Sequence, residues 1–227
     1  MRNKIIVGLS VAAAALLAFN LYKVFMVLPD EINQGAIYRI IYIHVPSAIT
    51  CFTCFFAAMI ASALFLIRKD MRYDAVAAAT TEVGLVFASV VLVTGSIWAR
   101  IIWGIWWTWD ARLTSMFVCW LLYAGYLMLR RAIDEPTQRA RLAAVLSIFA
   151  FTDVIIVWKS IEWWRTQHPG PVLSIRNGGG MAPGMEAPIW WNYLALVMVA
   201  TILIMVRMRQ EDFRREIDSM RRWAHAL

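Results

Sequence analysis

The sequence is short of charged residues and lacks a nucleotide-binding motif. Charged residues make up 16% of the 227 residues and hydrophobic residues 61%. A soluble domain of this composition would lack the polar surface needed to cover its core, so the bilayer is the expected solvent. The chain has neither a Gly-x-x-x-x-Gly-Lys phosphate loop nor an internal repeat. It is therefore not expected to hydrolyse a nucleotide, and energy for any transport would come from a partner.

Six apolar runs are long enough to cross about 30 Å of hydrocarbon. They cover residues 5–22, 48–67, 75–98, 113–129, 142–158 and 189–206. The runs are apolar on every face and lack the alternation of barrel strands. The sequence therefore predicts an all-α integral membrane protein, a bundle of six transmembrane helices in residues 1–206, with an outer tryptophan-rich loop at 98–112.

Basic residues are distributed unevenly between the alternate connections. The connections on one side carry 15 of the 22 Lys and Arg residues, including both ends of the chain, and those on the other side carry seven. The positive-inside rule then places both termini in the cytoplasm. The basic residues that set the orientation of the helices in the membrane account for the net charge of +7. No nucleic-acid partner is expected. A cleaved signal peptide is an alternative for the first run, but a retained helix is preferred because apolar residues continue past Ala18.

Residues 207–227 form a basic tail that is predicted to be a cytoplasmic helix. Phe213, Ile217, Met220 and Trp223 fall on one helical face, with Arg on the others. This pattern favours a helix lying on anionic lipid headgroups, with docking to a partner as the alternative.

The segment between the third and fourth predicted helices is rich in tryptophan. It reads Trp98-Ala-Arg-Ile-Ile-Trp103-Gly-Ile-Trp106-Trp107-Thr-Trp109-Asp110. An aromatic belt at the headgroups needs only one or two Trp per helix end. Five in one short segment favour a continuous apolar platform, which suits a large planar ligand such as haem.

Two of the three histidines lie on the predicted outer side. His44 precedes Pro46, which is expected to open the second helix, and His168 precedes Pro169 between the fifth and sixth helices. The third, His225, lies in the tail. A single histidine at a membrane boundary is usually structural, but two beside a tryptophan platform could fill both axial positions of a haem iron without a covalent link.

Three charged residues near this platform are candidates for contact with the ligand. Arg39 and Arg112 could each meet a haem propionate, although both could instead reach lipid headgroups. Asp110 precedes the fourth helix, where an acid is favoured as a cap, so a structural role is considered first.

Other polar residues within the spans suggest simpler roles. Cys51 and Cys54 resemble a redox pair in spacing, but Phe55 follows them where covalent haem attachment requires His. They are expected to be packing residues. Glu82 and Asp153 must face the bundle, a cavity or a partner helix, and the sequence leaves their partners open.

The chain strongly resembles the cytochrome c maturation protein C (CcmC) family of haem-handling membrane proteins. The resemblance is carried by the WWD motif, Trp103-Gly-Ile-Trp-Trp-Thr-Trp-Asp-Ala-Arg-Leu-Thr-Ser115, and three further landmarks in the same order. These landmarks are Tyr38-Arg-Ile-Ile-Tyr-Ile-His-Val-Pro46, Val93-Thr-Gly-Ser-Ile-Trp98 and Glu162-Trp-Trp-Arg-Thr-Gln-His168. Related haem lyases are longer and carry histidines within their spans.

The resemblance implies a function in cytochrome c maturation in the bacterial inner membrane, with the functional face periplasmic. It implies that His44 and His168 are axial ligands of non-covalently bound haem b, that the Trp-rich loop supports the ring, and that Arg39 and Arg112 serve the haem. Expected partners are a periplasmic haem chaperone, a small single-span subunit, and the permease and ATPase of an ABC transporter.

No bond chemistry of its own is expected from this haem-delivery subunit. Two alternatives remain open at this point: a membrane thiol oxidoreductase using Cys51 and Cys54, and a permease subunit without haem. The route by which haem arrives is also open.

Overall fold

The computed structural model describes residues 2–170, 173, 181–182 and 184–224. Side chains at 214–215, 218–219 and 221–224 are outside that description, as are the predictions for Trp223 and His225. The helices are α1 (Arg2–Tyr22), α2 (Ile41–Arg68), α3 (Met71–Ile102), α4 (Ala111–Ala132), α5 (Pro136–Trp163) and α6 (Ala187–Ala224). A π-helical turn (Lys23–Val27) follows α1, and a 3-10 turn (Ala36–Ile40) leads into α2.

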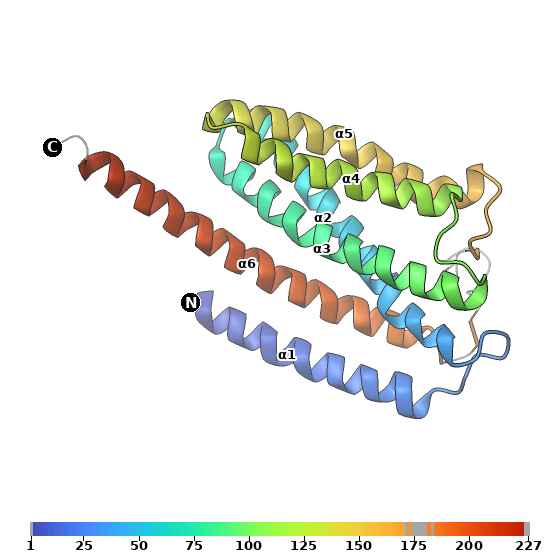
Figure 1. The fold of residues 1–227 in the computed structure, drawn as a ribbon. Coiled ribbons are helices and arrows are strands. Elements are labelled where there is room, and N and C mark those ends of the chain that lie inside the picture. The colour runs from blue at the N-terminus through green and yellow to red at the C-terminus, as the bar shows by residue number, and fades with distance from the viewer. Residues whose placement is uncertain (1, 171–172, 174–180, 183, 225–227) are drawn as a thin grey trace.

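In the described part of the chain, six helices are long and apolar enough to cross a membrane, which confirms the predicted six-helix class. Helices α2 and α3 lie at the centre, with α1 and α6 paired on one side and α4 and α5 on the other (Figure 1). The start of α1 and the end of α6 lie at the same end of the bundle, which we call the terminus end (Figure 1). The opposite end, where α1–α2, α3–α4 and α5–α6 are connected, is called the site end.

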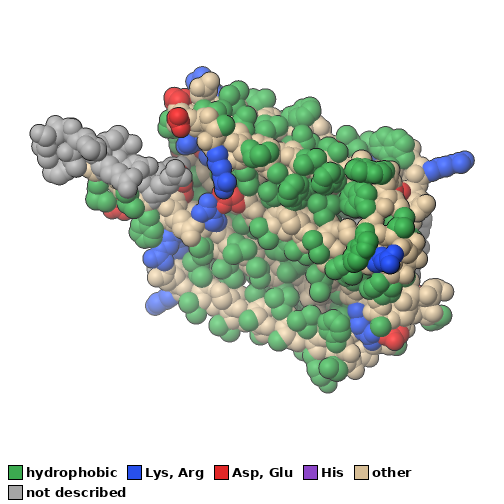
Figure 2. Space-filling model, in the orientation of Figure 1, with side chains coloured by type: hydrophobic (Ala, Val, Ile, Leu, Met, Phe, Trp, Pro, Cys, Tyr) green, Lys and Arg blue, Asp and Glu red, His purple; other side chains and the backbone are tan. Residues whose placement is uncertain are grey.

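Side chains on the flank of the bundle are largely hydrophobic. Figure 2 shows hydrophobic groups along the length of the helices, while Lys and Arg gather near the two ends, most of them at the terminus end. A surface of this kind suits lipid contact, because apolar side chains exposed along a bundle need not be shielded from hydrocarbon. The predicted cytoplasmic location of the termini stays a prediction.

The core forms where α2 and α3 approach closely. Gly84 makes this possible, since a Cβ atom there would lie 2.7 Å from Phe55 Cε1. Phe55 stacks in turn on Tyr123 of α4, with ring centroids 3.5 Å apart and planes 5° from parallel. Small residues at helix crossings are typical of membrane bundles, where close packing replaces the hydrophobic effect between helices.

The connections at the terminus end are shorter than the gaps between the predicted apolar runs. The helices continue past those runs into polar residues and end at capping residues. Lys69 ends α2 in the left-handed conformation at φ 57°, and Asp70 begins α3 by accepting a hydrogen bond from the Arg72 backbone at 2.8 Å. Glu135 caps α5 directly before Pro136 at the first helical position.

The intramembrane carboxylates have different surroundings. Glu82 pairs with Arg207 of α6, so these two residues join α3 to α6. Asp153 is 7% exposed, and one of its oxygens has no hydrogen-bond partner among the described residues. Asp74, which the sequence did not single out, pairs with Arg130 at 2.9 Å between α3 and α4.

Helix α6 continues unbroken past residue 206, where the tail was predicted to begin. The pair between Arg207 and Glu82 still holds α6 against the bundle at that point. Farther on, Phe213, Ile217 and Met220 are exposed. The tail is thus a direct extension of the last span.

A chain of polar groups joins α1, α6 and α2 near the site end. The buried Asn20 side chain donates to the Pro188 carbonyl and to the Asn192 side chain, both at 2.9 Å. Asn192 then donates to the Tyr42 carbonyl at 2.7 Å. Hydrogen bonds of this kind connect helices that share an apolar environment.

Candidate functional site

His44 lies within the first turns of α2 and not ahead of it, as the sequence had suggested. The expectation that His44 lies ahead of the second helix was therefore wrong, because the 3-10 turn carries the chain into α2 at Ile41. His44 Nδ1 lies 2.9 Å from Thr94 Oγ1 of α3. Gly95 leaves room for the ring, since a Cβ atom there would lie 3.3 Å from His44 Cε1. The half-buried imidazole is held between the two central helices.

Pro46 does not open α2 but lies inside it. Proline has no N–H, so the carbonyl of Tyr42, four residues earlier, loses its normal helical partner. The Asn192 side chain of α6 donates to this carbonyl and compensates for the loss. The helix can therefore continue through the proline, with His44 on its first turns.

His168 lies in the connection after α5. Its backbone N–H donates to Thr166 Oγ1 at 3.0 Å, and its Nδ1 is 2.8 Å from the Pro169 carbonyl oxygen. Burial is the main cause that lowers the pKa of His168, with a contribution from the nearby positive charge of Arg112. The imidazole is therefore neutral near pH 7, the form that can bind a metal.

Asp110 caps α4, as predicted, and also joins the two loops of the site. One carboxylate oxygen accepts from the Arg112 backbone at 2.8 Å, and the other accepts from the Gln167 backbone at 2.9 Å. Burial alone would raise the pKa of Asp110, but hydrogen bonds from Thr166, Gln167 and the α4 backbone lower it overall. The carboxylate therefore stays charged and fixes the segment next to His168.

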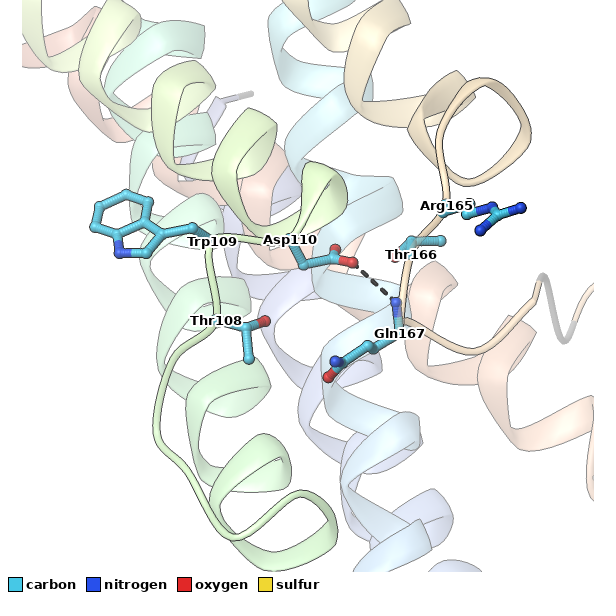
Figure 3. A pocket seen from close by; sticks show the side chains of 6 residues that line it. All are labelled: Thr108, Trp109, Asp110, Arg165, Thr166 and Gln167. Atoms are coloured by element: carbon cyan, nitrogen blue, oxygen red, sulfur yellow. Dashed lines mark hydrogen bonds between the residues drawn. The ribbon is translucent and has the colours of Figure 1, made fainter.

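Figure 3 shows this junction at close range. Asp110 points toward the Gln167 backbone, while the Trp109 ring and the Arg165 side chain extend to opposite sides. A depression of about 470 Å³ lies here, lined by Thr108, Trp109, Asp110, Arg165, Thr166 and Gln167. Its size is within the range of small-molecule sites, although neither histidine lines it.

Four of the five tryptophans of this segment lie in two edge-to-face clusters, and the single continuous platform that the sequence suggested stays a prediction. In the first, Trp98 and Trp103 meet edge to face, with centroids 5.0 Å apart. Trp98 Nε1 also donates to Gln34 Oε1 at 2.8 Å, which ties this cluster to the α1–α2 connection.

The second cluster is centred on Trp107. Its ring meets Trp109 edge to face at 6.0 Å and Phe117 of α4 at 5.9 Å. Trp106 and Trp109 are 60% and 76% exposed. These two rings therefore offer accessible aromatic surface at the site end, as a ligand or an aromatic belt would use.

The two arginines have different surroundings. Arg39 donates to the carbonyls of Val24 and Leu28, at 2.9 and 3.0 Å, and pairs with Asp30. It thus holds the π-helical turn and the residues that follow α1, and contact with a propionate stays a prediction. Arg112 donates to the Val157 carbonyl of α5.

Arg112 and the two histidines form one electrostatic group. Arg112 lies within electrostatic range of His44 and of His168, and His44 lies within electrostatic range of His168. The structure therefore brings together three of the predicted site residues, from α2, α4 and the α5–α6 connection.

The site end also contains polar atoms that lack partners. Trp107 Nε1, Thr108 Oγ1 and Thr114 Oγ1 are buried without a hydrogen bond among the described residues. Such atoms are uncommon in native proteins and often mark a missing ligand or water. Neutral imidazoles of His44 and His168 can bind a metal, and Arg112 can bind a carboxylate. Together with these unpaired atoms, the three side chains fit haem, which has an iron and two propionates.

The cysteines do not form an accessible redox pair. Cys51 is fully buried and Cys54 is 4% exposed, and both are free thiols in the core between α2 and α3. This burial supports the packing role over thiol exchange, which needs access to an attacking thiolate.

Sequence reasoning missed the residues that support the histidines. Thr94 and Gly95 lie in the landmark 93–98, but nothing in that segment identified His44 as their neighbour. Asn192 acts through its side chain, which donates to the Tyr42 carbonyl. Gln167, next to His168, acts through its backbone N–H, which donates to Asp110. Pro46 gave no signal of the donor from Asn192, because the sequence placed it at the start of the helix, where a proline needs no such partner.

Comparisons with known proteins agree on one description. A family model described as heme exporter protein C matches residues 1–223. The heme exporter protein C of Bradyrhizobium diazoefficiens is 34% identical over 217 residues, which cover 96% of this chain and 82% of that protein. Its namesake in Escherichia coli K12 is 34% identical over 201 residues, covering 88% and 81%. That of Paracoccus denitrificans is 31% identical over 193 residues, covering 85% and 80%.

Proposed function

The chain belongs to the heme exporter protein C family, and on this premise we propose that it handles haem during cytochrome c maturation. It binds haem b non-covalently at the site end and presents it to a periplasmic haem chaperone. It carries out no bond chemistry of its own. The site end faces the periplasm from the bacterial inner membrane.

One arrangement carries this proposal: His44 of α2, held by Thr94, and His168 of the α5–α6 connection come from segments far apart in the sequence and gather near Arg112 of α4 at the site end. Two neutral imidazoles from separate elements can supply both axial ligands of a haem iron. Neither needs a covalent link to the ring, so the cargo can leave again.

The remaining site residues contribute to the ring and its propionates. Arg112, near both histidines, is assigned to a propionate, since a guanidinium binds a carboxylate through two hydrogen bonds. Trp106 and Trp109 offer exposed rings for contact with the macrocycle, and Trp103 and Trp107 are assigned to the same binding surface. Arg39 supports the site through the α1–α2 connection, and Asp110 through the two loops.

The proposed partners are those that the family resemblance implies. Besides haem and membrane lipid, they are a periplasmic haem chaperone, a small single-span membrane subunit, and the permease and ATPase of an ABC transporter. The absence of a phosphate loop in this chain agrees with energy supplied by a separate ATPase.

The proposal is tested by the haem content of protein purified from haem-replete cells. We expect the wild type to show a six-coordinate bis-histidine spectrum. His44→Ala and His168→Ala should each hold haem weakly, with a changed spectrum that added imidazole partly restores, and the double variant should retain little. A His225→Ala variant serves as the matched control and should behave as the wild type does. A wild-type spectrum in both site variants would contradict the assignment.

A further inference from the structure

In both candidate ligand histidines, Nδ1 is already hydrogen-bonded within the protein. His44 Nδ1 lies 2.9 Å from Thr94 Oγ1, and His168 Nδ1 lies 2.8 Å from the Pro169 carbonyl oxygen. In a neutral imidazole one nitrogen is a donor and the other an acceptor, so the partner decides which nitrogen carries the hydrogen.

The partner of His168 allows only one assignment. A carbonyl oxygen has no hydrogen to donate, so Nδ1 must donate to Pro169. Nε2 of the neutral ring then has a free lone pair.

The partner of His44 leads to the same assignment by a count of hydrogens. Thr94 Oγ1 lies 2.7 Å from the Val90 carbonyl oxygen and 3.3 Å from that of Val91. The hydroxyl has a single hydrogen, and at 2.7 Å two oxygens without a hydrogen between them would repel. The hydrogen therefore points to Val90, in the back-bonding geometry common for Thr in helices. Only the oxygen lone pairs remain for His44, so its Nδ1 is the donor.

We infer that Thr94 and the Pro169 carbonyl lock both histidines in the Nδ1–H tautomer, and that Thr94 is a positioning residue for the Nε2 ligand of His44. The part concerning haem rests on the proposed function. An acceptor behind a ligating histidine fixes the ring orientation and raises the basicity of the coordinating nitrogen. Gly95 supports this arrangement, because a Cβ atom there would lie 3.3 Å from His44 Cε1.

The tautomer is tested first without haem, by ¹⁵N NMR of histidine-labelled full-length protein in detergent at about pH 8, where an ordinary imidazole is neutral. A His168→Ala, His225→Ala variant leaves His44 as the one labelled ring. We expect a protonated Nδ1 and an unprotonated Nε2. The opposite pattern would overturn the inference for His44.

The positioning role is tested with haem bound, by comparing Thr94→Val with Thr94→Ser and with a matched control. Thr80 provides the control, since it is buried on the same helix and its Oγ1 makes the same 2.7 Å back-bond, to Val76. We expect Thr94→Val to bind haem about 10-fold more weakly and its haem to have a higher reduction potential, because the imidazole donates less electron density. Thr94→Ser and Thr80→Val should match the wild type.

The outcomes separate this inference from the proposed function. If wild-type protein binds bis-histidine haem and Thr94→Val shows the same affinity and potential, the positioning role is wrong and the proposed function stands. If wild-type protein binds no haem, the proposed function fails, and the haem-free NMR pattern still decides the tautomer.

Discussion

Asp110 is a residue whose two carboxylate oxygens have separate partners, one in α4 and one in the segment before His168. Replacing Asp110 by Ala removes the helix cap, which is worth about 1 kcal/mol. It also frees the Gln167 backbone. We therefore expect Asp110→Ala to lower stability and to weaken haem retention together, as measured by detergent-mixture unfolding and by Soret absorbance.

Glu135→Ala is the matched control for Asp110→Ala. Glu135 caps α5 at the terminus end through the backbones of Thr137 and Gln138, which lowers its pKa, and it touches neither site loop. Its loss should affect stability but leave haem retention unchanged. Equal losses of haem in both variants would show that Asp110 acts only through general stability.

The lowered pKa values of His168 and Asp110 predict how acid affects the site. Burial keeps the folded pKa of His168 below its unfolded value of about 6.5. Protonation then favours the opened loop, so loop stability is complete above that value and falls as the pH drops below it. For Asp110 the stabilisation is present above its unfolded value of about 3.9 and is lost as pH falls through its lowered folded pKa.

We therefore expect haem retention to fall in two stages on acidification, with ligation moving the histidine stage to lower pH than in the haem-free protein. A Soret titration measures both stages, and Asp110→Asn should lack the more acidic one. Haem loss that begins well above pH 6.5, or an acid stage that Asp110→Asn leaves unchanged, would be at odds with this account.

At the scale of the helix, α2 depends on α6 for the donor that Pro46 lacks. Asn192→Leu leaves the Tyr42 carbonyl unpaired and should destabilise the protein by about 1–3 kcal/mol. In a Pro46→Ala background the helix regains its own N–H donor, so the same substitution should cost less. A double-mutant cycle on unfolding free energies measures this coupling. Additive effects would mean that Asn192 does not compensate for the proline.

The contact between α2 and α3 depends on Gly84. Gly84→Ala places a Cβ atom 2.7 Å from Phe55 Cε1, and we expect a loss of about 1–3 kcal/mol from overpacking. Gly125→Ala in α4 is the control, since a Cβ there has no neighbour within 4 Å, and it should be neutral or slightly stabilising. Unfolding in detergent mixtures compares the two, and equal stability would argue against the close crossing.

The six helices could be predicted because the length of each apolar run falls within the range of transmembrane helices, about 17–25 residues. Their ends could not be predicted as well, since caps such as Lys69 and Asp70 extend helices beyond the apolar residues. The start of α2 was missed for a different reason. A donor from Asn192, 150 residues away, permits the helix to contain Pro46, and local sequence carries no record of that contact.

Consecutive spans cross the membrane in opposite directions, so alternate connections lie on the same side. This alone placed His44, His168 and the tryptophans at one end of the bundle. Their supporting contacts were out of reach of the sequence, because Thr94 and Gln167 are ordinary residue types whose roles arise from packing. The arrangement of the tryptophans in two edge-to-face clusters likewise follows from tertiary contacts with Gln34 and Phe117.

At the scale of the whole molecule, the predicted orientation can be tested by labelling single cysteines in intact cells. The native cysteines are buried, which leaves a low background. We expect Gln167→Cys at the site end to react with a membrane-impermeant maleimide added outside the inner membrane, and Thr137→Cys at the terminus end to react only after lysis. The reverse pattern would show that the bundle is inserted the other way round.

The pairing of α1 with α6 has a consequence for the order of assembly. Helix α1 packs chiefly against α6, and the buried Asn20 finds its partners at Pro188 and Asn192. Synthesis proceeds from the N-terminus, so the first helix to leave the ribosome meets its main neighbour only when the last span has been made. Until then the Asn20 side chain lies in lipid without its native hydrogen-bond partners. The free-energy cost of leaving it unpaired favours early association with other polar groups. The bundle is therefore closed by its first and last helices, and a nascent chain that stalls before α6 would leave α1 unanchored.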